Sequence, residues 1–252
     1  MKIALRKTSL VDYPGRVSAV IFFSGCNLRC PWCHNGDLVL GKETSDLVTL
    51  AEGLAHIKKR RSVLGGVVLS GGEPCLYEEL PDIIAEIKKI ALSPGSAPLQ
   101  VKLDTNGMFP AMLEKLFSRE ESRPDYIALD LKIAPARYGE LSAPPRLCEN
   151  SSFQEFDLGN RLVQSAALIR ASGIAHEYRT LALPGAFITE KDIEALAPLV
   201  DDAPWYFRPF RGGNCLESAW DGLEAPAGEA HTLLEALAEK AKERKKNRMT
   251  VN

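Results

Sequence analysis

Residues 26–35 read CNLRCPWCHN and place three cysteines, Cys26, Cys30 and Cys33, at C-x3-C-x2-C spacing. A strongly apolar run, residues 17–23 (VSAVIFF), comes just before them and predicts a buried strand. Ligands of parallel α/β proteins bind at the carboxyl ends of the strands. The three thiols are therefore expected at the end of a strand, where a binding site would form.

Three thiolates are one too few for a structural zinc site, which takes four protein ligands. His34 is a poor fourth ligand because it directly follows Cys33, whereas zinc motifs separate their ligands by two or more residues. An iron–sulfur cube is normally held by four thiolates. A cube held by three leaves one iron open to an outside ligand, which makes it a reaction centre. The remaining interpretation is three unrelated thiols, and their spacing within one loop argues against it.

Apolar, β-branched runs alternate with stretches of helical period along the chain, which predicts repeated βα units and a parallel sheet. The expected strands cover residues 17–23, 66–70, 100–103, 126–131, 176–183 and 205–210. The expected helices carry their apolar positions within residues 47–57, 80–90, 162–169, 193–200 and 233–237. Thr49 with Glu52, and Thr189 with Asp192, have the spacing of helix caps. Six such units predict an α/β fold, a partial and open (β/α)6 barrel.

The chain has 252 residues, of which 45% are hydrophobic, and a net charge of −2. This size fits one domain over residues 1–252, and the charge balance argues against nucleic acid or an anionic membrane as partner. No signal peptide or membrane span is visible, so a cytoplasmic protein is expected. Cys75, Cys148 and Cys215 form no second motif and are interpreted as incidental. The irregular residues 134–158 predict a long loop, and the basic residues 240–248 a solvated helix end.

Polar or glycine-containing sequence follows the later strands. The segments are Gly71-Gly72-Glu73, Asp104-Thr105-Asn106-Gly107, Asp130 with Lys132, and Arg179. Each has an ordinary structural interpretation, because Gly-Gly and Asn-Gly also form turns. Asp130 and Lys132 could simply pair with each other, and Arg179 could pair with Glu177 or Asp130. Parallel strands would nevertheless bring all of these side chains to one rim.

The cysteine motif resembles the signature of the radical S-adenosylmethionine (SAM) superfamily, in which an aromatic residue, here Trp32, precedes the third cysteine. With Gly25 before it and His34-Asn35 after it, the motif most resembles that of the activating enzymes of glycyl radical enzymes. The nearest likeness is to the activating proteins of anaerobic ribonucleoside-triphosphate reductase, with the pyruvate formate-lyase activating enzymes more distant. Residues 7–15 (KTSLVDYPG) also resemble the start of that group.

This resemblance implies a [4Fe–4S] cluster on Cys26, Cys30 and Cys33, which are then both the metal ligands and the catalytic residues. It also implies a pocket for SAM, with Gly71, Gly72 and Glu73 near the amino group of its methionine part. The residues expected to bind the cofactor are Trp32, which should pack on the adenine, His34, Gly71, Gly72, Glu73, Asp104, Thr105, Asn106, Asp130, Lys132 and Arg179. For residues 207–211 (FRPFR) the resemblance implies only that they lie near a protein substrate.

The implied reaction is reductive cleavage of SAM and transfer of the radical to a glycine of a partner, with anaerobic ribonucleotide reductase as the expected glycyl radical enzyme. A flavodoxin or ferredoxin type reductant would supply the electron. Residues 34–66 contain no cysteine, so the second-cluster insertion of some activating enzymes is missing and one cluster is expected. The alternative is a radical SAM enzyme that acts on a small molecule or another peptide. A non-catalytic iron–sulfur carrier or zinc module would leave the strand-end motifs unexplained.

Overall fold

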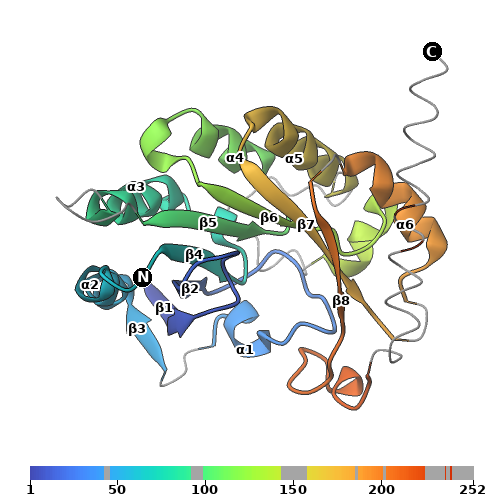
Figure 1. Ribbon diagram of the computed structural model, residues 1–252. Helices are drawn as coiled ribbons and strands as arrows, with labels where there is room; N and C mark the ends of the chain where they lie inside the picture. Colours follow the sequence, from blue (N-terminus) through green and yellow to red (C-terminus); the bar gives the residue numbers. More distant parts are fainter. Residues whose placement is uncertain are drawn as a thin grey trace.

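One eight-stranded sheet organises the chain, with the strand order β3-β1-β2-β4-β5-β6-β7-β8 (Figure 1). The computed structural model describes residues 1–42, 46–91, 99–142, 158–184, 187–200 and 203–224, together with residues 236 and 239. The strands are β1 (Lys2–Ser9), β2 (Ser18–Phe23), β3 (Leu47–Thr49), β4 (Gly66–Gly71), β5 (Gln100–Thr105), β6 (Tyr126–Asp130), β7 (Ala175–Ala182) and β8 (Trp205–Pro209).

Strands β2, β4, β5, β6, β7 and β8 run parallel to one another, and they are the six that the alternating pattern predicts. The sheet curves without closing, because β3 and β8 lie at its two edges. The predicted α/β fold, a partial barrel, is therefore confirmed. All six parallel strands end at the same rim, which places the loops that follow them side by side.

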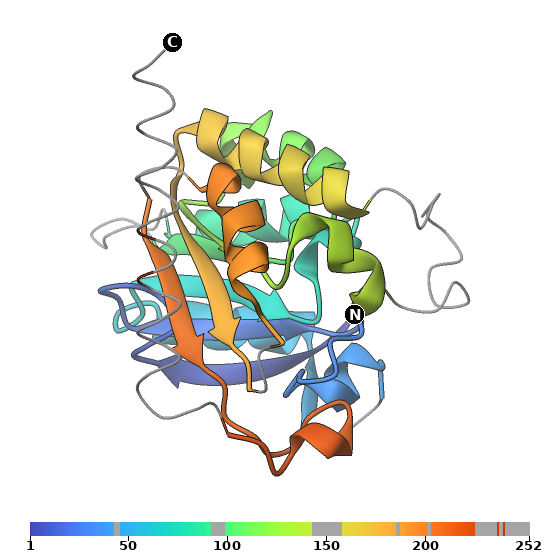
Figure 2. The same ribbon diagram turned by 90° about the vertical axis from the view of Figure 1, so that its right-hand side faces the viewer.

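Helices cover the outer face of the curved sheet, as Figures 1 and 2 show from two directions. They are α2 (Leu50–Arg60), α3 (Leu80–Ala91), α4 (Pro110–Phe117), α5 (Leu158–Ser172) and α6 (Glu190–Leu196), whereas the short α1 (Gly36–Val39) follows the cysteine loop at the rim. Short 3₁₀ turns are η1 (Pro74–Leu76), η2 (Glu120–Ser122), η3 (Pro135–Leu141), η6 (Ala197–Leu199) and η7 (Ser218–Trp220). Both predicted capping boxes, Thr49 with Glu52 and Thr189 with Asp192, are present.

The core lies between the sheet and these helices. Alternate side chains of the central strands, such as Ile21, Leu69 and Leu103, are fully buried against the helix layer. The opposite face of the same strands points into the barrel, where Val20 and Val68 form a small separate cluster with other side chains. Burial on both faces explains why the parallel strands read as continuous apolar runs.

Two antiparallel strands at one side of the sheet were not expected from the sequence. β1 pairs antiparallel with β2, and β3 pairs antiparallel with β1. The expectation that Leu47 belongs to a helix is wrong, because it opens β3 and the helix begins only at Leu50. The apolar positions of the last expected helix, Leu233, Leu234 and Leu237, lie outside the described residues, as do the basic residues 240–248 and Cys148.

The long loop expected at residues 134–158 is only partly described. Its first part forms η3 and its last residue opens α5, while residues 143–157 are outside the described ranges. Among the helices that the structure does describe, none is long and apolar enough to cross a membrane.

Candidate active site

The cysteine loop leaves the carboxyl end of β2, as predicted. Cys26, Cys30 and Cys33 line one cavity of about 410 Å³. The loop is held by backbone bonds: the Cys33 N–H donates to the Cys30 carbonyl at 3.0 Å, and the Arg29 N–H donates to the Leu141 carbonyl of η3 at 2.7 Å. The three thiols thus open toward a shared space of the size that binds small ligands.

Burial makes two of the three thiols, those of Cys26 and Cys30, hard to ionise. It raises the pKa of Cys26 to about 12, with the nearby Glu73 charge adding to the effect. It raises the pKa of Cys30 to about 11, although the positive charge of Lys132 works against the rise. Metal binding would therefore have to displace protons from these sulfurs, which is the usual coupling of metal affinity to pH.

The Gly-Gly-Glu turn packs directly on the backbone that leads into the cysteine loop. Gly71 has a φ of +116°, a conformation that favours glycine. A Cβ on Gly72 would lie 1.7 Å from the Gly25 carbonyl oxygen, so only glycine fits. The Gly72 N–H donates to the Phe23 carbonyl and the Glu73 N–H to the Gly25 carbonyl, both at 2.9 Å. Both glycines also line the cavity with the thiols, so the turn belongs to the same site.

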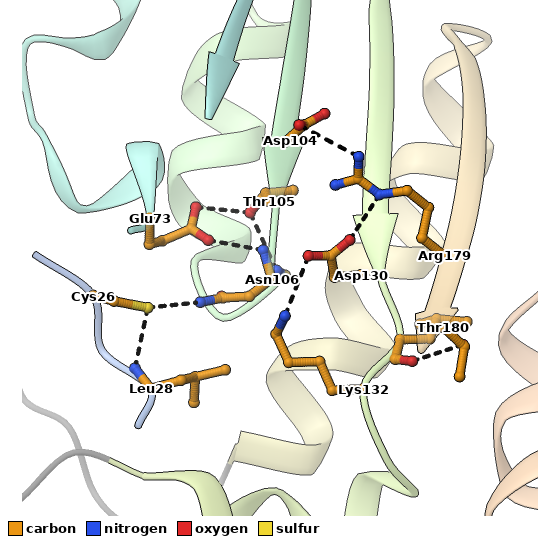
Figure 3. Close-up of polar contacts among 12 residues, drawn as sticks. Cys26, Leu28, Glu73, Asp104, Thr105, Asn106, Asp130, Lys132, Arg179 and Thr180 are labelled. Carbon is orange, nitrogen blue, oxygen red and sulfur yellow. Dashed lines mark hydrogen bonds and ion pairs between the residues drawn. The ribbon is translucent and has the colours of Figure 1, made fainter. Parts of the chain in front are cut away.

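The carboxylate of Glu73 is only 1% exposed and is held by its own chain. Its Oε1 accepts bonds from the Thr105 hydroxyl at 2.8 Å and the Cys75 N–H at 3.0 Å. Its Oε2 accepts the Asn106 N–H at 2.7 Å (Figure 3). Burial raises the pKa of Glu73 despite these donors. The side chain thus joins the turn after β4 to the end of β5.

A chain of ion pairs crosses the rim from β5 to β7 (Figure 3). Arg179 contacts Asp104 at 3.4 Å and Asp130 at 2.8 Å, and Lys132 contacts Asp130 at 3.2 Å. Burial raises the pKa of Asp130, but the charges of Arg179 and Lys132 outweigh it and bring the pKa to about 2. The pairings of Asp130 with Lys132 and with Arg179, both considered from the sequence, are thus present, whereas Glu177 pairs with Lys102. They leave Asp104, Asp130, Lys132 and Arg179 lining the cavity together.

Trp32 is 4% exposed and lies within a group of aromatic rings. Its ring centroid is 5.0 Å from that of Phe187 and 5.3 Å from that of Trp220. Trp32 also lines the cavity, so part of the ring faces the site while the rest is covered by neighbours. His34 is exposed, and its ring lies 5.7 Å from that of Phe210.

The segment after β8 closes over the cysteine loop, where Figure 2 shows it in orange beside α1. The Leu216 N–H donates to the Cys33 carbonyl at 2.8 Å, and the Glu217 N–H donates to the Pro31 carbonyl at 3.0 Å. Cys215 lies in this segment, where burial is the main reason for its raised pKa. Cys75 is buried below the Gly-Gly-Glu turn and lines neither described cavity of the rim.

A second cavity of about 400 Å³ adjoins the first and shares Trp32, Asp130, Lys132 and Arg179 with it. Lys102 lies at this cavity and was missed in the sequence. Its side chain is 3% exposed and pairs with Asp104 at 3.1 Å and with Glu177 at 3.5 Å. Only its position inside the apolar strand QVKL could have drawn attention to it.

The donor set fits a cluster better than a single ion. In the parts of the chain that the structure describes, no three His, Cys, Asp or Glu side chains converge as they would on one metal ion. A cube takes each thiolate at a different iron, so its ligands do not need to meet at one point. The buried Nδ2 of Asn27, beside Cys26, has no hydrogen-bond partner among the described residues. Such a donor suits an anionic group bound at the thiols.

Comparison with known proteins identifies relatives of this chain. The chain is 32% identical over 198 residues to a Methanocaldococcus jannaschii protein provisionally named as a glycyl-radical enzyme activating enzyme, covering 79% of this chain and 74% of that one. It is 32% identical over 136 residues to the pyruvate formate-lyase-activating enzyme of Clostridium pasteurianum, covering 51% of each. It is also 27% identical over 195 residues to the 7-carboxy-7-deazaguanine synthase of Methanothermobacter thermautotrophicus, covering 75% and 71%.

Solved structures share the fold. Streptococcus suis SuiB bound to the precursor peptide SuiA superposes with a TM-score of 0.57 at 14% identity, and covers 91% of this chain and 46% of its own. The structure of native anSMEcpe with bound AdoMet gives a TM-score of 0.54 at 17% identity, with 74% and 49% covered. The chain thus spans about half the length of these structures. The model of the Radical SAM superfamily matches residues 20–199. The chain therefore belongs to the radical SAM superfamily, whose members use a [4Fe–4S] cluster and SAM.

Proposed function

We propose that this radical SAM enzyme activates a glycyl radical enzyme, and that its partner is an anaerobic ribonucleoside-triphosphate reductase. The observation that carries the proposal is the gathering of three thiols, the Gly-Gly-Glu turn and the Asp-Thr-Asn segment around one cavity. Similarity to proteins named as activating enzymes supports the activity. The reductase as partner rests on the likeness of residues 7–15 and 25–35 to that group of activating proteins.

The bound cluster and SAM would supply the difficult chemistry, which is reductive cleavage of SAM by one external electron and removal of a hydrogen atom from a glycine Cα. The chain's own residues would hold and orient them. Cys26, Cys30 and Cys33 would ligate three irons. The backbone of Gly71 and Gly72, which lines the cavity with the three thiols, would approach the amino group of SAM.

The ion-paired side chains would orient the rest of SAM. Asp104, Asp130, Lys132 and Arg179 hold one another in place, so their polar atoms would be positioned before the cofactor arrives. Thr105 and Asn106 would shape the same wall, and His34 would lie at its exposed margin. Trp32 would pack on the adenine with the face that its aromatic neighbours leave open.

Exclusion of water is the other task of the protein, because a free carbon radical reacts with the nearest C–H bond. The aromatic group around Trp32 and the segment of residues 211–224 cover the cysteine loop on one side. The second cavity, which shares a wall with the first, would admit the glycine-bearing segment of the partner. A flavodoxin or ferredoxin type protein would provide the electron. Both proteins would be located in the cytoplasm.

A second candidate is a radical SAM enzyme that acts on a small molecule. The similarity to 7-carboxy-7-deazaguanine synthase over 75% of the chain supports this second candidate. The two candidates use the same cluster and the same SAM cleavage, so they differ only in the group that gives up the hydrogen atom. A substrate test therefore separates them.

The test begins with anaerobic reconstitution of the protein with iron and sulfide, followed by SAM and a strong chemical reductant. We expect 5′-deoxyadenosine and, with anaerobic ribonucleotide reductase from the same genome, the doublet of a glycyl radical in electron paramagnetic resonance. A doublet on a different glycyl radical enzyme would identify that enzyme as the partner instead. 5′-Deoxyadenosine with no protein radical on any candidate would favour the small-molecule enzyme. No 5′-deoxyadenosine under any condition would refute both.

A further inference from the structure

Two N–H groups face the sulfur of Cys26 (Figure 3). One is the backbone N–H of Leu28, whose nitrogen lies 3.4 Å from Sγ. The other is the side-chain amide of Asn106, whose Nδ2 lies 3.7 Å from Sγ. The first is local to the cysteine loop. The second comes from the end of β5, so the fold as a whole places it there.

The Asn106 amide can present only its NH₂ group to the sulfur. Its Oδ1 accepts a bond from the Met108 N–H at 3.0 Å. Its Nδ2 also donates to Asn27 Oδ1 at 2.8 Å. A flipped amide would turn its oxygen toward the Asn27 oxygen and would lose both of these bonds. The orientation of the donor toward Cys26 is thus fixed by two neighbours.

The Asn106 backbone is fixed as well. Its N–H donates to Glu73 Oε2 at 2.7 Å, and the residue is only 4% exposed. Glu73 in turn belongs to the turn that packs on the start of the cysteine loop. The Gly-Gly-Glu turn therefore reaches the Cys26 sulfur through Asn106, along bonds made entirely within the chain.

Hydrogen bonds to the sulfur ligands of an iron–sulfur cluster change its reduction potential. Reduction adds negative charge to the cluster and its thiolates, so an N–H donor stabilises the reduced form more than the oxidised form. We propose that Asn106 is a positioning residue that raises the reduction potential of the cluster through its bond to Cys26. This inference rests on the proposed cluster at Cys26, Cys30 and Cys33.

The test measures the midpoint potential of the reconstituted cluster without SAM or partner, by a reductive titration followed with electron paramagnetic resonance. Asn106→Asp keeps the shape and the oxygen that accepts from Met108, but it replaces the donor with an acceptor. Asn35→Asp is the matched control, because Asn35 lines the same cavity and its Nδ2 donates to the Gly71 carbonyl instead. Both variants add one carboxylate to the cavity.

We expect Asn106→Asp to lower the equilibrium constant of reduction about tenfold, which is about 59 mV for one electron. Asn106→Ala should shift the potential in the same direction by less, because it removes the donor without adding charge. Asn27→Ala should also lower the potential, because the amide loses the oxygen that orients it. Asn35→Asp should change it least. Iron and sulfide content would be measured for every variant.

Equal potentials in wild type, Asn106→Ala and Asn27→Ala at equal iron content would overturn the inference and leave the proposed function intact. A shift in Asn35→Asp as large as that in Asn106→Asp would also overturn it, since charge alone would then explain the effect. If Asn106→Asp takes up no cluster, the alanine variants decide. A wild-type protein that takes up no cluster would refute the proposed function and this inference together.

Discussion

Replacing Gly72 by alanine should push the Gly-Gly-Glu turn away from the cysteine loop. The new Cβ would lie 1.7 Å from the Gly25 carbonyl oxygen and 2.5 Å from its carbonyl carbon, whereas ordinary contacts begin at 3.4 Å. Both neighbours are backbone atoms, which cannot turn away as a flexible side chain can. The two segments must therefore separate by about 1.7 Å.

The expected loss of stability follows from the contacts that this separation breaks. The bonds from the Gly72 N–H to Phe23 and from the Glu73 N–H to Gly25 would be lost, at about 1 kcal/mol each. Overpacking adds about 1–3 kcal/mol. We expect the free energy of unfolding to fall by about 3–5 kcal/mol, which is a large share of the roughly 5–15 kcal/mol of a typical domain.

The assay is urea unfolding of the reduced protein before cluster reconstitution, followed by measurement of bound iron after it. Gly139→Ala is the control, because Gly139 is an exposed residue of η3 and a Cβ there would meet nothing within 4 Å. The Gly72→Ala protein should unfold at lower urea and bind less iron, while the control should match the wild type. A Gly72→Ala protein that is as stable as the wild type and binds as much iron would refute the reasoning.

Three further predictions concern single side chains of the site. Cys30→Ala should lose the cluster absorbance and SAM cleavage together, and retained 5′-deoxyadenosine formation would contradict the ligand assignment. Asp130→Asn should lower the free energy of unfolding by about 1–2 kcal/mol at neutral pH, because Arg179 loses a partly exposed partner. Since the pKa of Asp130 is about 2 in the folded protein, the wild type is more stable than the variant above about pH 4, and this difference in stability is lost toward pH 2. A difference in the free energy of unfolding that does not shrink between about pH 5 and about pH 3 would contradict this prediction. Trp220→Ala should open the aromatic group around Trp32 and lower the free energy of unfolding by about 1–3 kcal/mol, and an unchanged midpoint in urea would show that other side chains cover that ring.

The parallel part of the fold could be predicted because each of its strands and helices has a recognisable pattern within its own residues. Strands buried on both faces read as apolar runs, and helices between them read as amphipathic stretches with caps at Thr49 and Thr189. β1 was missed because Lys2, Arg6 and Lys7 are exposed among its apolar residues, so its pattern resembles that of a surface segment.

The site could be predicted as a set of motifs, but not as a set of contacts. The sequence places polar residues after successive strands, and the parallel topology then brings them to one rim. The partners depend on register between strands that are distant in sequence. Lys102 meets Glu177 only because β5, β6 and β7 align as they do. Asn106 meets Cys26 for the same reason, and no local pattern contains that information.

The two backbone bonds from the segment after β8 to the cysteine loop have a consequence for synthesis of the protein. Leu216 and Glu217 supply donors to Cys33 and Pro31, which are translated much earlier. At about 5–20 residues per second, the cysteine loop leaves the ribosome roughly 10–40 seconds before these donors exist. Iron and sulfide delivered during that interval meet thiols on a loop that still lacks these two bonds. Assembly of the cluster in its final setting must therefore follow translation of residue 217, and a ribosome that stalls before it leaves a nascent chain with exposed, oxidisable cysteines.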